Sequence, residues 1–203
     1  MARYIAIERE YGSGGRAVAA RLSELCSIPN YGREILVTAA QRLHIPVSQL
    51  EQYEESTTNS FLYSVNLIGR AQTGDPDMLM REGHLFVAEQ LAIRDLASHG
   101  PAIFVGHCAS EALKGYGEVL RVFIKSSMAD RKHRITREYG IPDNEVDSTI
   151  RRFDKKRAGY YSINTARKWR DPNNYDIILD SSTLGVEGCA AALYALAEKE
   201  IHR

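Results

Sequence analysis

The residues with the clearest chemistry form a glycine-rich stretch, EREYGSGGR, from Glu8 to Arg16. It follows the apolar run of residues 4–7 and precedes apolar residues at helical spacing, so the order is strand, glycine loop, helix. Glycines let the backbone turn sharply and point its N–H groups inward, and the following helix adds the positive end of its dipole. We therefore predict a phosphate-binding loop, with an ordinary glycine turn as the alternative. Its residues are Gly12, Ser13, Gly14, Gly15 and Arg16.

The loop matches the Walker A pattern GxxxxGK[ST] only in part. Gly15 stands at the last glycine, but Glu10 replaces the first. Arg16 replaces the lysine, and Ala17 replaces the magnesium-binding hydroxyl. Because Arg16 keeps the positive charge, we expect it to contact the β- and γ-phosphates of a nucleotide.

A second cluster of charge is RRFDKKRAGYY, residues 151–161, in which Arg151, Asp154 and Arg157 are spaced three apart on one helical face. One arginine guanidinium can donate two hydrogen bonds to the oxygens of a phosphate. A carboxylate between two arginines can hold a sugar hydroxyl while keeping the arginines apart. We predict that Arg157, with Arg151 or Arg152, binds phosphate. The alternative is an exposed, salt-bridged helix end. The basic segment Ile163 to Asn174 is predicted to close over a phosphate chain or to be a loop anchored by its tryptophan.

A third element, Gly106-His107-Cys108-Ala109-Ser110, leaves an apolar strand for a helix. In a doubly wound fold this is where groups facing the substrate lie. A single histidine at a strand end is more often an ordinary surface residue, but beside the other two elements His107 is a candidate substrate-binding residue.

Composition restricts the class of protein. No apolar run approaches the ~20 residues of a membrane span, the first residues lack the apolar region of a signal peptide, and the three cysteines are scattered without metal-ligand spacing. We therefore expect a cytoplasmic protein with no membrane partner, no resident metal site and no disulfide, either monomeric or homodimeric.

Net charge is zero, yet residues 121–170 contain 14 Lys or Arg and 6 Asp or Glu. One basic region in a balanced chain favours a small polyanion as partner over nucleic acid; the alternative is a solvated basic face.

Apolar runs alternate with helical patterns along the chain, which predicts an α/β fold with a parallel sheet between helices. Strands are expected at 3–8, 102–105, 119–125 and 176–179. Helices are expected at 34–43 and 46–54, and a third has Leu85, Ala88, Ala92 and Leu96 on its inner face. A fourth begins near Met128. A fifth runs from Asp143 past Arg157 with Val146, Ile150 and Phe153 facing inward, and the last begins at about Val186. Residues 56–77 are polar and mixed, and we expect a mobile insert there.

Taken in order, the motifs resemble the cytidylate kinase-like family, relatives of bacterial cytidylate kinase among the P-loop nucleoside monophosphate kinases. They are IAIEREYGSGGR, PNYGREIL, IFVGHCAS, LRVFIKSSMADRKHRI, FDKKRAGYY and NYDIILDSSTLGVE, and they cover nearly the whole chain. The resemblance implies one P-loop kinase domain over residues 1–203, with a three-layer α/β/α architecture and about five parallel strands, the fifth around 27–31. Residues 31–96 resemble the insert that binds the monophosphate, and residues 151–170 resemble the lid.

The resemblance also implies roles for single residues. Gly12 to Arg16 would hold the phosphates of ATP, Asp154 and Arg157 would contact the sugar and phosphate of the acceptor, and Ser181, Ser182 and Thr183 would lie where the donor base packs. A magnesium ion would need Ser13, Glu8 or water in place of the hydroxyl missing at position 17.

The implied activity is transfer of the ATP γ-phosphoryl group to a nucleoside monophosphate, CMP or dCMP being the first choice, with Arg16, Arg157 and Asp154 as the catalytic residues. The family's Gly-Arg-Cys-Ala-Asp reads here with His107 and Ser110, and its Tyr-Asp reads Tyr31-Gly32. These departures keep a second hypothesis open: a catalytically impaired regulatory protein that binds a nucleotide.

Overall fold

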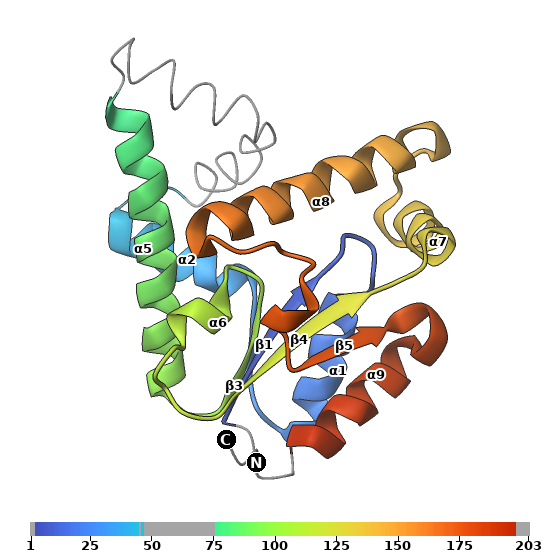
Figure 1. Cartoon of the computed structure of the whole chain (residues 1–203), viewed down its shortest axis with the longest axis horizontal. Helices are drawn as coiled ribbons and strands as arrows, with labels where there is room; N and C mark the ends of the chain where they lie inside the picture. Colours follow the sequence, from blue (N-terminus) through green and yellow to red (C-terminus); the bar gives the residue numbers. More distant parts are fainter. Residues whose placement is uncertain (1–2, 45, 47–75, 198–203) are drawn as a thin grey trace.

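A five-stranded parallel sheet forms the centre of the computed structural model, which describes residues 3–44, 46 and 76–197 (Figure 1). The strands are β1 (Tyr4–Arg9), β2 (Asn30–Tyr31), β3 (Ala102–Val105), β4 (Val119–Lys125) and β5 (Ile177–Asp180). Their order is β2-β3-β1-β4-β5, and every neighbouring pair is parallel. The carboxyl ends of the strands therefore meet along one edge, with β1 in the middle. The predicted parallel sheet is confirmed.

Strand bounds differ slightly from the predicted ones. β1 continues one residue further, to Arg9, and β5 begins one residue later, at Ile177. Asp176 precedes β5 because its carboxylate accepts hydrogen bonds from the backbone N–H and the guanidinium of Arg121. The fifth strand expected from the resemblance is β2, a pair of residues beside β3.

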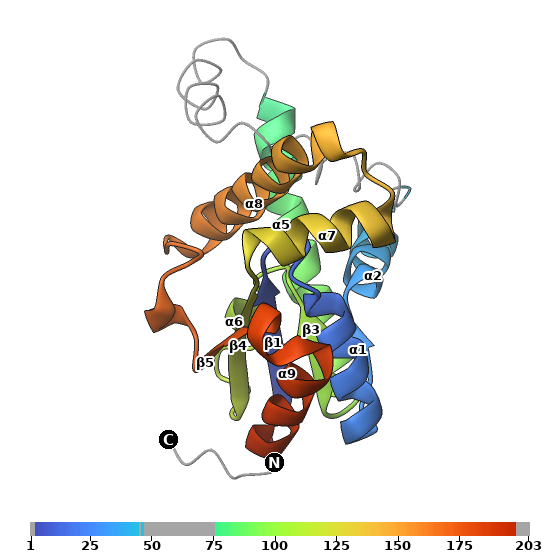
Figure 2. The ribbon, with the colours of Figure 1, turned by 90° about the vertical axis from the view of Figure 1, so that its right-hand side faces the viewer.

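Helices cover both faces of the sheet, which gives the predicted three layers (Figures 1 and 2). On one face lie α1 (Gly15–Cys26) and α9 (Ser181–Ala197), whose Leu22 and Leu193 pack with Ile5. On the other lie α2 (Arg33–Leu43), α5 (Pro76–Ser98) and α6 (Ala109–Ala112), where Ile93 packs with Phe104. Residues of β1 alternate between the two cores, as a strand between two layers requires.

Two further helices, α7 (Met128–Tyr139) and α8 (Asp143–Thr165), follow β4 and lie at the carboxyl edge of the sheet, where Figure 1 shows α8 crossing above the strands. Ser127 caps α7 by accepting the N–H of Asp130, and Gly140 ends it in the left-handed conformation. A short 3-10 turn, Pro172–Asn174, leads into β5. These helices bring the basic region of residues 121–170 to the glycine loop.

Several expected helix limits are corrected. α9 begins at Ser181 rather than near Val186, because a first turn precedes a kink at Gly185, where φ is 67°. α5 already includes residues 76 and 77, which we had placed in the insert. Residues 47–54 and 56–75 lie outside the described residues, so the helix and insert expected there stay predictions. Among the described helices, none is both long and apolar enough to cross a membrane.

Candidate active site

The glycine loop lies at the carboxyl end of β1, and α7 fixes its backbone. Gly12 and Gly14 have φ angles of 76° and 75°, a region that other residues rarely adopt. Arg131 Nε donates to the carbonyl of Tyr11 at 2.7 Å, and Arg134 Nη1 donates to the carbonyl of Gly12 at 2.7 Å. Two loop carbonyls are thus turned toward α7. The loop then enters α1, whose first N–H groups have no partner within the helix.

A cavity of about 490 Å³ opens beside the loop. Its wall combines the loop, the start of α2, the turn after β3 and one side of α8, and its size suits a small molecule. Its charged lining residues are Arg9, Arg16, Arg33, Lys156, Arg157, Glu8 and Glu10. Five positive groups against two negative ones, next to the positive end of α1, favour a polyanion such as a phosphate chain.

Aromatic rings form one side of this cavity. Tyr11 and Phe153 stack with their centroids 4.3 Å apart and their planes 9° apart, and Tyr139 lies 5.8 Å from Tyr11. We expected Phe153 to face the core with Val146 and Ile150. Those two are buried against Ile135, but Phe153 lies on the cavity side, where it stacks on the loop.

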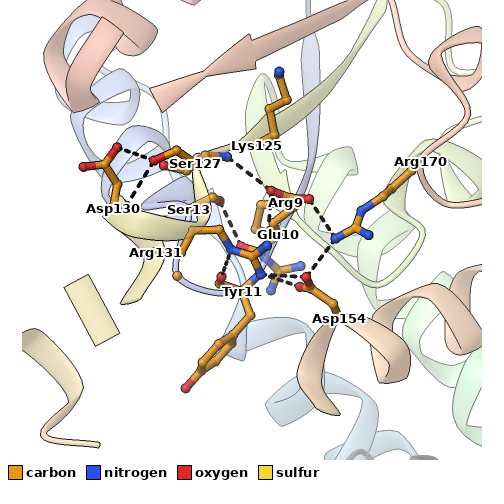
Figure 3. Close-up of polar contacts among 12 residues, drawn as sticks. Arg9, Glu10, Tyr11, Ser13, Lys125, Ser127, Asp130, Arg131, Asp154 and Arg170 are labelled. Atoms are coloured by element: carbon orange, nitrogen blue, oxygen red, sulfur yellow. Dashed lines mark hydrogen bonds and ion pairs between the residues drawn. The ribbon is translucent and has the colours of Figure 1, made fainter. Parts of the chain in front are cut away.

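Asp154 sits at the centre of an ionic network that joins the loop to α7, α8 and the segment before β5 (Figure 3). One oxygen accepts the N–H of Tyr11 at 2.8 Å, and the other accepts from Arg131 at 2.6 Å and Arg170 at 2.8 Å. Arg170 also pairs with Glu10 at 2.7 Å. We expected Asp154 between Arg151 and Arg157, but its partners are arginines from other elements. Its predicted contact with a sugar hydroxyl stays a prediction.

Arg157 reaches under the loop from α8. Its Nη1 donates to the carbonyl of Arg9 at 2.8 Å, and its guanidinium lies 5.4 Å from the centroid of the Tyr11 ring. Burial, and then repulsion by Arg9, lower the pKa of Arg157 to about 9. It is therefore cationic at neutral pH, and a phosphate placed against it would relieve the repulsion.

His107 lines the cavity from the turn after β3, where its φ is 57°. Its Nδ1 donates to Glu89 of α5 at 3.2 Å, and the hydroxyl of Tyr160 donates to the same carboxylate. Glu89 is fully buried, and Gln90 donates to the carbonyl of His107 at 3.1 Å. A buried carboxylate thus fixes the histidine and a tyrosine of α8 on the wall of the cavity.

The structure brings six predicted residues to the cavity: Gly12, Gly14, Gly15, Arg16, His107 and Arg157. Others lie elsewhere. Ser13 is buried beneath the loop, where its hydroxyl donates to the carbonyl of Glu10, and Ser181 donates to the carbonyl of Ser13 at 2.6 Å. Ser182 and Thr183 are exposed at the start of α9, and Arg151 and Arg152 are exposed on α8, all outside the lining. Their predicted contacts with ligands stay predictions.

A magnesium ion would find few protein ligands here. Within the described residues, no group of three His, Cys, Asp or Glu side chains could hold a metal. Of the replacements suggested for the missing hydroxyl, Ser13 is turned to Glu10, whereas Glu8 lines the cavity and accepts from Trp169 Nε1 at 3.2 Å. Magnesium commonly takes one or two carboxylates together with substrate phosphates. The residues therefore fit magnesium that arrives on a nucleotide, and Glu8 would be the side chain to hold it.

Sequence reasoning assigned no role to Arg9, Arg33, Lys156, Glu89 or Tyr160, although the first three and Tyr160 line the cavity. Arg33 carried a signal, because it begins α2 directly after Gly32 and so borders a helix N-terminus. Arg9 carried another, because it directly precedes the loop. Glu89 is spaced as an ordinary helical residue, and only the fold shows that it is buried against His107.

The sequence matches the model of the cytidylate kinase-like family over residues 4–183. The chain belongs to this family. A search of curated proteins finds no match. Membership of the cytidylate kinase-like family agrees with the resemblance noted for the motifs, and the glycine loop, His107 and Arg157 all lie within the matched range.

Solved structures share the fold across almost the whole chain. An uncharacterized protein from Eubacterium ventriosum superposes with a TM-score of 0.71 and 22% identity, covering 97% of this chain and 99% of that one. Shikimate kinase from Bacteroides thetaiotaomicron superposes with a TM-score of 0.56 and 14% identity, covering 97% of this chain and 98% of that one. TT1252 from Thermus thermophilus superposes with a TM-score of 0.54 and 17% identity, covering 98% of each chain. At these identities the likeness shows the three-layer P-loop kinase fold alone.

Proposed function

We propose that this chain transfers the γ-phosphoryl group of ATP to a nucleoside monophosphate, with CMP or dCMP as the acceptor. The observation that carries the proposal is the cavity that joins the glycine loop and Arg16 to Arg157 of α8. Phosphoryl transfer needs positioning and charge neutralisation more than covalent chemistry, and five cationic side chains around one small cavity supply both. Membership of a kinase-like family supports the same reaction.

In this proposal the loop and Arg16 hold the donor phosphates, and residues 31–96 receive the monophosphate. Arg157, with Arg151 or Arg152 after closure of residues 151–170, binds the phosphate in transfer. Asp154 accepts the ribose hydroxyl. Its two oxygens already accept three hydrogen bonds, but a carboxylate has about four lone-pair positions, so one further donor is compatible with the network.

The bond between the γ-phosphorus and the bridging oxygen of ATP breaks, and its electron pair stays on ADP. A phosphate oxygen of the monophosphate forms the new bond to phosphorus, giving a nucleoside diphosphate. This oxygen is already ionised at neutral pH, so the chain needs no general base for the step. Magnesium bound with the nucleotide would neutralise charge on its phosphates, and Glu8 would hold that complex.

A coupled assay of ATP consumption tests the proposal. CMP, dCMP, UMP, AMP, GMP and small hydroxylated metabolites are each supplied with saturating Mg-ATP. We expect acceptor-dependent ADP formation with CMP or dCMP, and about a hundredfold lower kcat in Arg16→Ala and Arg157→Ala. Lack of turnover with every acceptor would remove the proposal. Selective turnover of a hydroxylated metabolite would keep the kinase and replace the acceptor.

A second candidate is a protein that binds nucleotide without turnover. It is favoured by Glu10, whose carboxylate lines the cavity where the Walker pattern has a glycine and holds Arg170. For such a protein, thermal shift should show stabilisation by ATP, about 2.7 kcal/mol at a hundred times the dissociation constant, and the coupled assay should show no ADP. Arg16→Ala and Arg157→Ala would then weaken ATP binding only.

A further inference from the structure

Arg9 is the last residue of β1 and lines the cavity, and it lies next to Glu10 and Tyr11 (Figure 3). Its carbonyl accepts the hydrogen bond from Arg157, and its side chain is part of the lining. The proposed function counts its charge among the five cationic side chains of the cavity but assigns it no contact with a ligand.

Two glycines make room for the Arg9 side chain. A Cβ on Gly15 would lie 2.6 Å from Arg9 Cβ and 2.9 Å from its Cγ. A Cβ on Gly106 would lie 2.0 Å from Arg9 Nη1 and 2.9 Å from its Cζ. The stem of Arg9 therefore crosses the first residue of α1, and its guanidinium lies against the turn after β3. An arginine loses rotamer freedom when it is fixed in this way, so the path has to be stabilised by the fold around it.

The path ends among other positive charges. Arg9 and Arg16 both act to lower the pKa of Arg157, and all three line the same cavity. Three positive guanidinium groups around one cavity give it a field that favours an anionic ligand.

We propose that Arg9 is a phosphate-binding residue, which contacts the transferred phosphoryl group between the loop and the turn that carries His107. Gly15 belongs to the loop that holds the donor, and Gly106 precedes His107, so a guanidinium spanning both lies where donor and acceptor phosphates meet. Its planar fork can donate two hydrogen bonds to one phosphate. It exchanges no proton and forms no bond to phosphorus. This role rests on the proposed function for the reaction that Arg9 assists, but phosphate binding itself can be measured without turnover.

Isothermal titration with inorganic triphosphate at pH 7.5 measures the binding. Arg9→Met keeps an unbranched apolar stem across Gly15 and removes the charge. Hydrogen bonds to charged groups contribute about 1.5–3 kcal/mol, so we expect the affinity to fall about ten- to hundredfold, and its dependence on salt to weaken. Arg9→Lys keeps the charge without the planar fork, so its affinity for triphosphate should lie between those of wild type and Arg9→Met. Equal affinity in wild type and Arg9→Met overturns the inference, as does a wild type that does not bind triphosphate.

A glycine pair tests the same role without touching Arg9. Gly106→Ala and Gly115→Ala both introduce a side chain at a positive φ, +82° and +83°. Only the first meets Arg9, because no atom of the described residues lies within 4 Å of a Cβ at Gly115. We expect Gly106→Ala to displace the guanidinium and weaken triphosphate binding about tenfold, whereas Gly115→Ala binds as the wild type does. Equal affinities in the two variants would contradict the assignment. This pair also decides the matter if Arg9→Met fails to fold.

The coupled assay separates this inference from the proposed function. If wild type binds triphosphate through Arg9 but phosphorylates no monophosphate, the proposed function fails and the binding role stands. If CMP turns over and Arg9→Met retains both the kcat and the triphosphate affinity of wild type, the role of Arg9 fails alone. A fall in kcat with little change in the KM for CMP would place Arg9 at the phosphoryl group rather than at the acceptor.

Discussion

Asp154 of α8 accepts a hydrogen bond from the backbone N–H of Tyr11 in the glycine loop, at 2.8 Å and across 143 positions of sequence. Through its second oxygen it also holds Arg131 of α7, whose side chain is 3% exposed. One carboxylate thereby fixes the loop and compensates a buried cation. The loop owes its position to α8 as well as to its own glycines.

Asp154→Ala should therefore destabilise the chain. Among the carboxylates of the described residues, it leaves the buried Arg131 with Glu10 at 3.5 Å, and breaking a buried ion pair costs about 3–5 kcal/mol. Denaturant unfolding, followed by fluorescence of the single tryptophan, Trp169, which is 2% exposed, measures this loss. Asp147→Ala on the same helix is the control, because that exposed carboxylate pairs only with Lys132 in solvent and should leave the unfolding midpoint unchanged. A similar midpoint in both variants would show that the network does not stabilise the fold.

Glu89→Gln tests the buried carboxylate behind His107. An amide oxygen can still accept from one of His107 and Tyr160, but the amide NH₂ then faces the other donor. We expect a loss of about 1–3 kcal/mol in unfolding free energy and a rise in the KM for the acceptor, with little change in the affinity for ATP. Glu187→Gln, which alters an exposed pair with Arg21, should change none of these. An acceptor KM equal to that of wild type would mean that His107 does not meet the acceptor.

Glu10→Gln should increase the affinity for inorganic triphosphate. Its carboxylate lines the cavity and pairs with Arg170 at 2.7 Å, so it both repels phosphate and holds a cation that phosphate could use. Removing the charge should tighten binding about fivefold, equivalent to about 1 kcal/mol. Glu138→Gln removes the same charge from an exposed site on α7 and controls for net charge. Unchanged or weaker binding in Glu10→Gln would show that the carboxylate does not compete with the ligand.

The fold was predictable where a local signal had a single interpretation. The continuous apolar run of β3, residues 102–105, has only one place in such a chain, between two helical layers. The glycines of the loop likewise required positive φ angles, and Gly12 and Gly14 have them. The predicted ends of elements were wrong where tertiary contacts decide them. Asp176, for example, pairs with Arg121 and lies just before β5.

The site was predictable only in part, because its partners come from distant elements. Spacing correctly placed Asp154 and Arg157 on one helix, but their orientation depends on α7 and on the loop. Arg131 and Arg170 are two of 26 Lys and Arg residues, and nothing in their spacing marks them as the partners of Asp154. Burial of a charge is a property of the assembled layers, so Glu89 could not be recognised from its position in a helix.

The charge of Arg157 should make the affinity for phosphate ligands depend on pH. Its pKa is lowered to about 9 by burial and by Arg9, so the group is protonated at neutral pH and loses its charge as the pH rises through about 9. A bound phosphate favours the charged form, so binding should raise this pKa and take up a proton near pH 9. The affinity for ATP should consequently fall as the pH rises from 8 to 10.

Arg157→Gln separates this effect from titration of the ligand and of other groups. The ratio of wild-type to variant affinity cancels ionisation of ATP, and burial raises the pKa of the Tyr11 phenol above its usual value, which favours its neutral form. We expect the ratio to be constant below about pH 8 and to approach one as Arg157 loses its proton. Titration at pH 9 in two buffers of different ionisation enthalpy should show proton uptake in wild type and less in the variant. If the ratio of affinities does not change between pH 7.5 and 10, Arg157 keeps its charge over this range. Its charge would then be compensated by protein groups before any ligand binds.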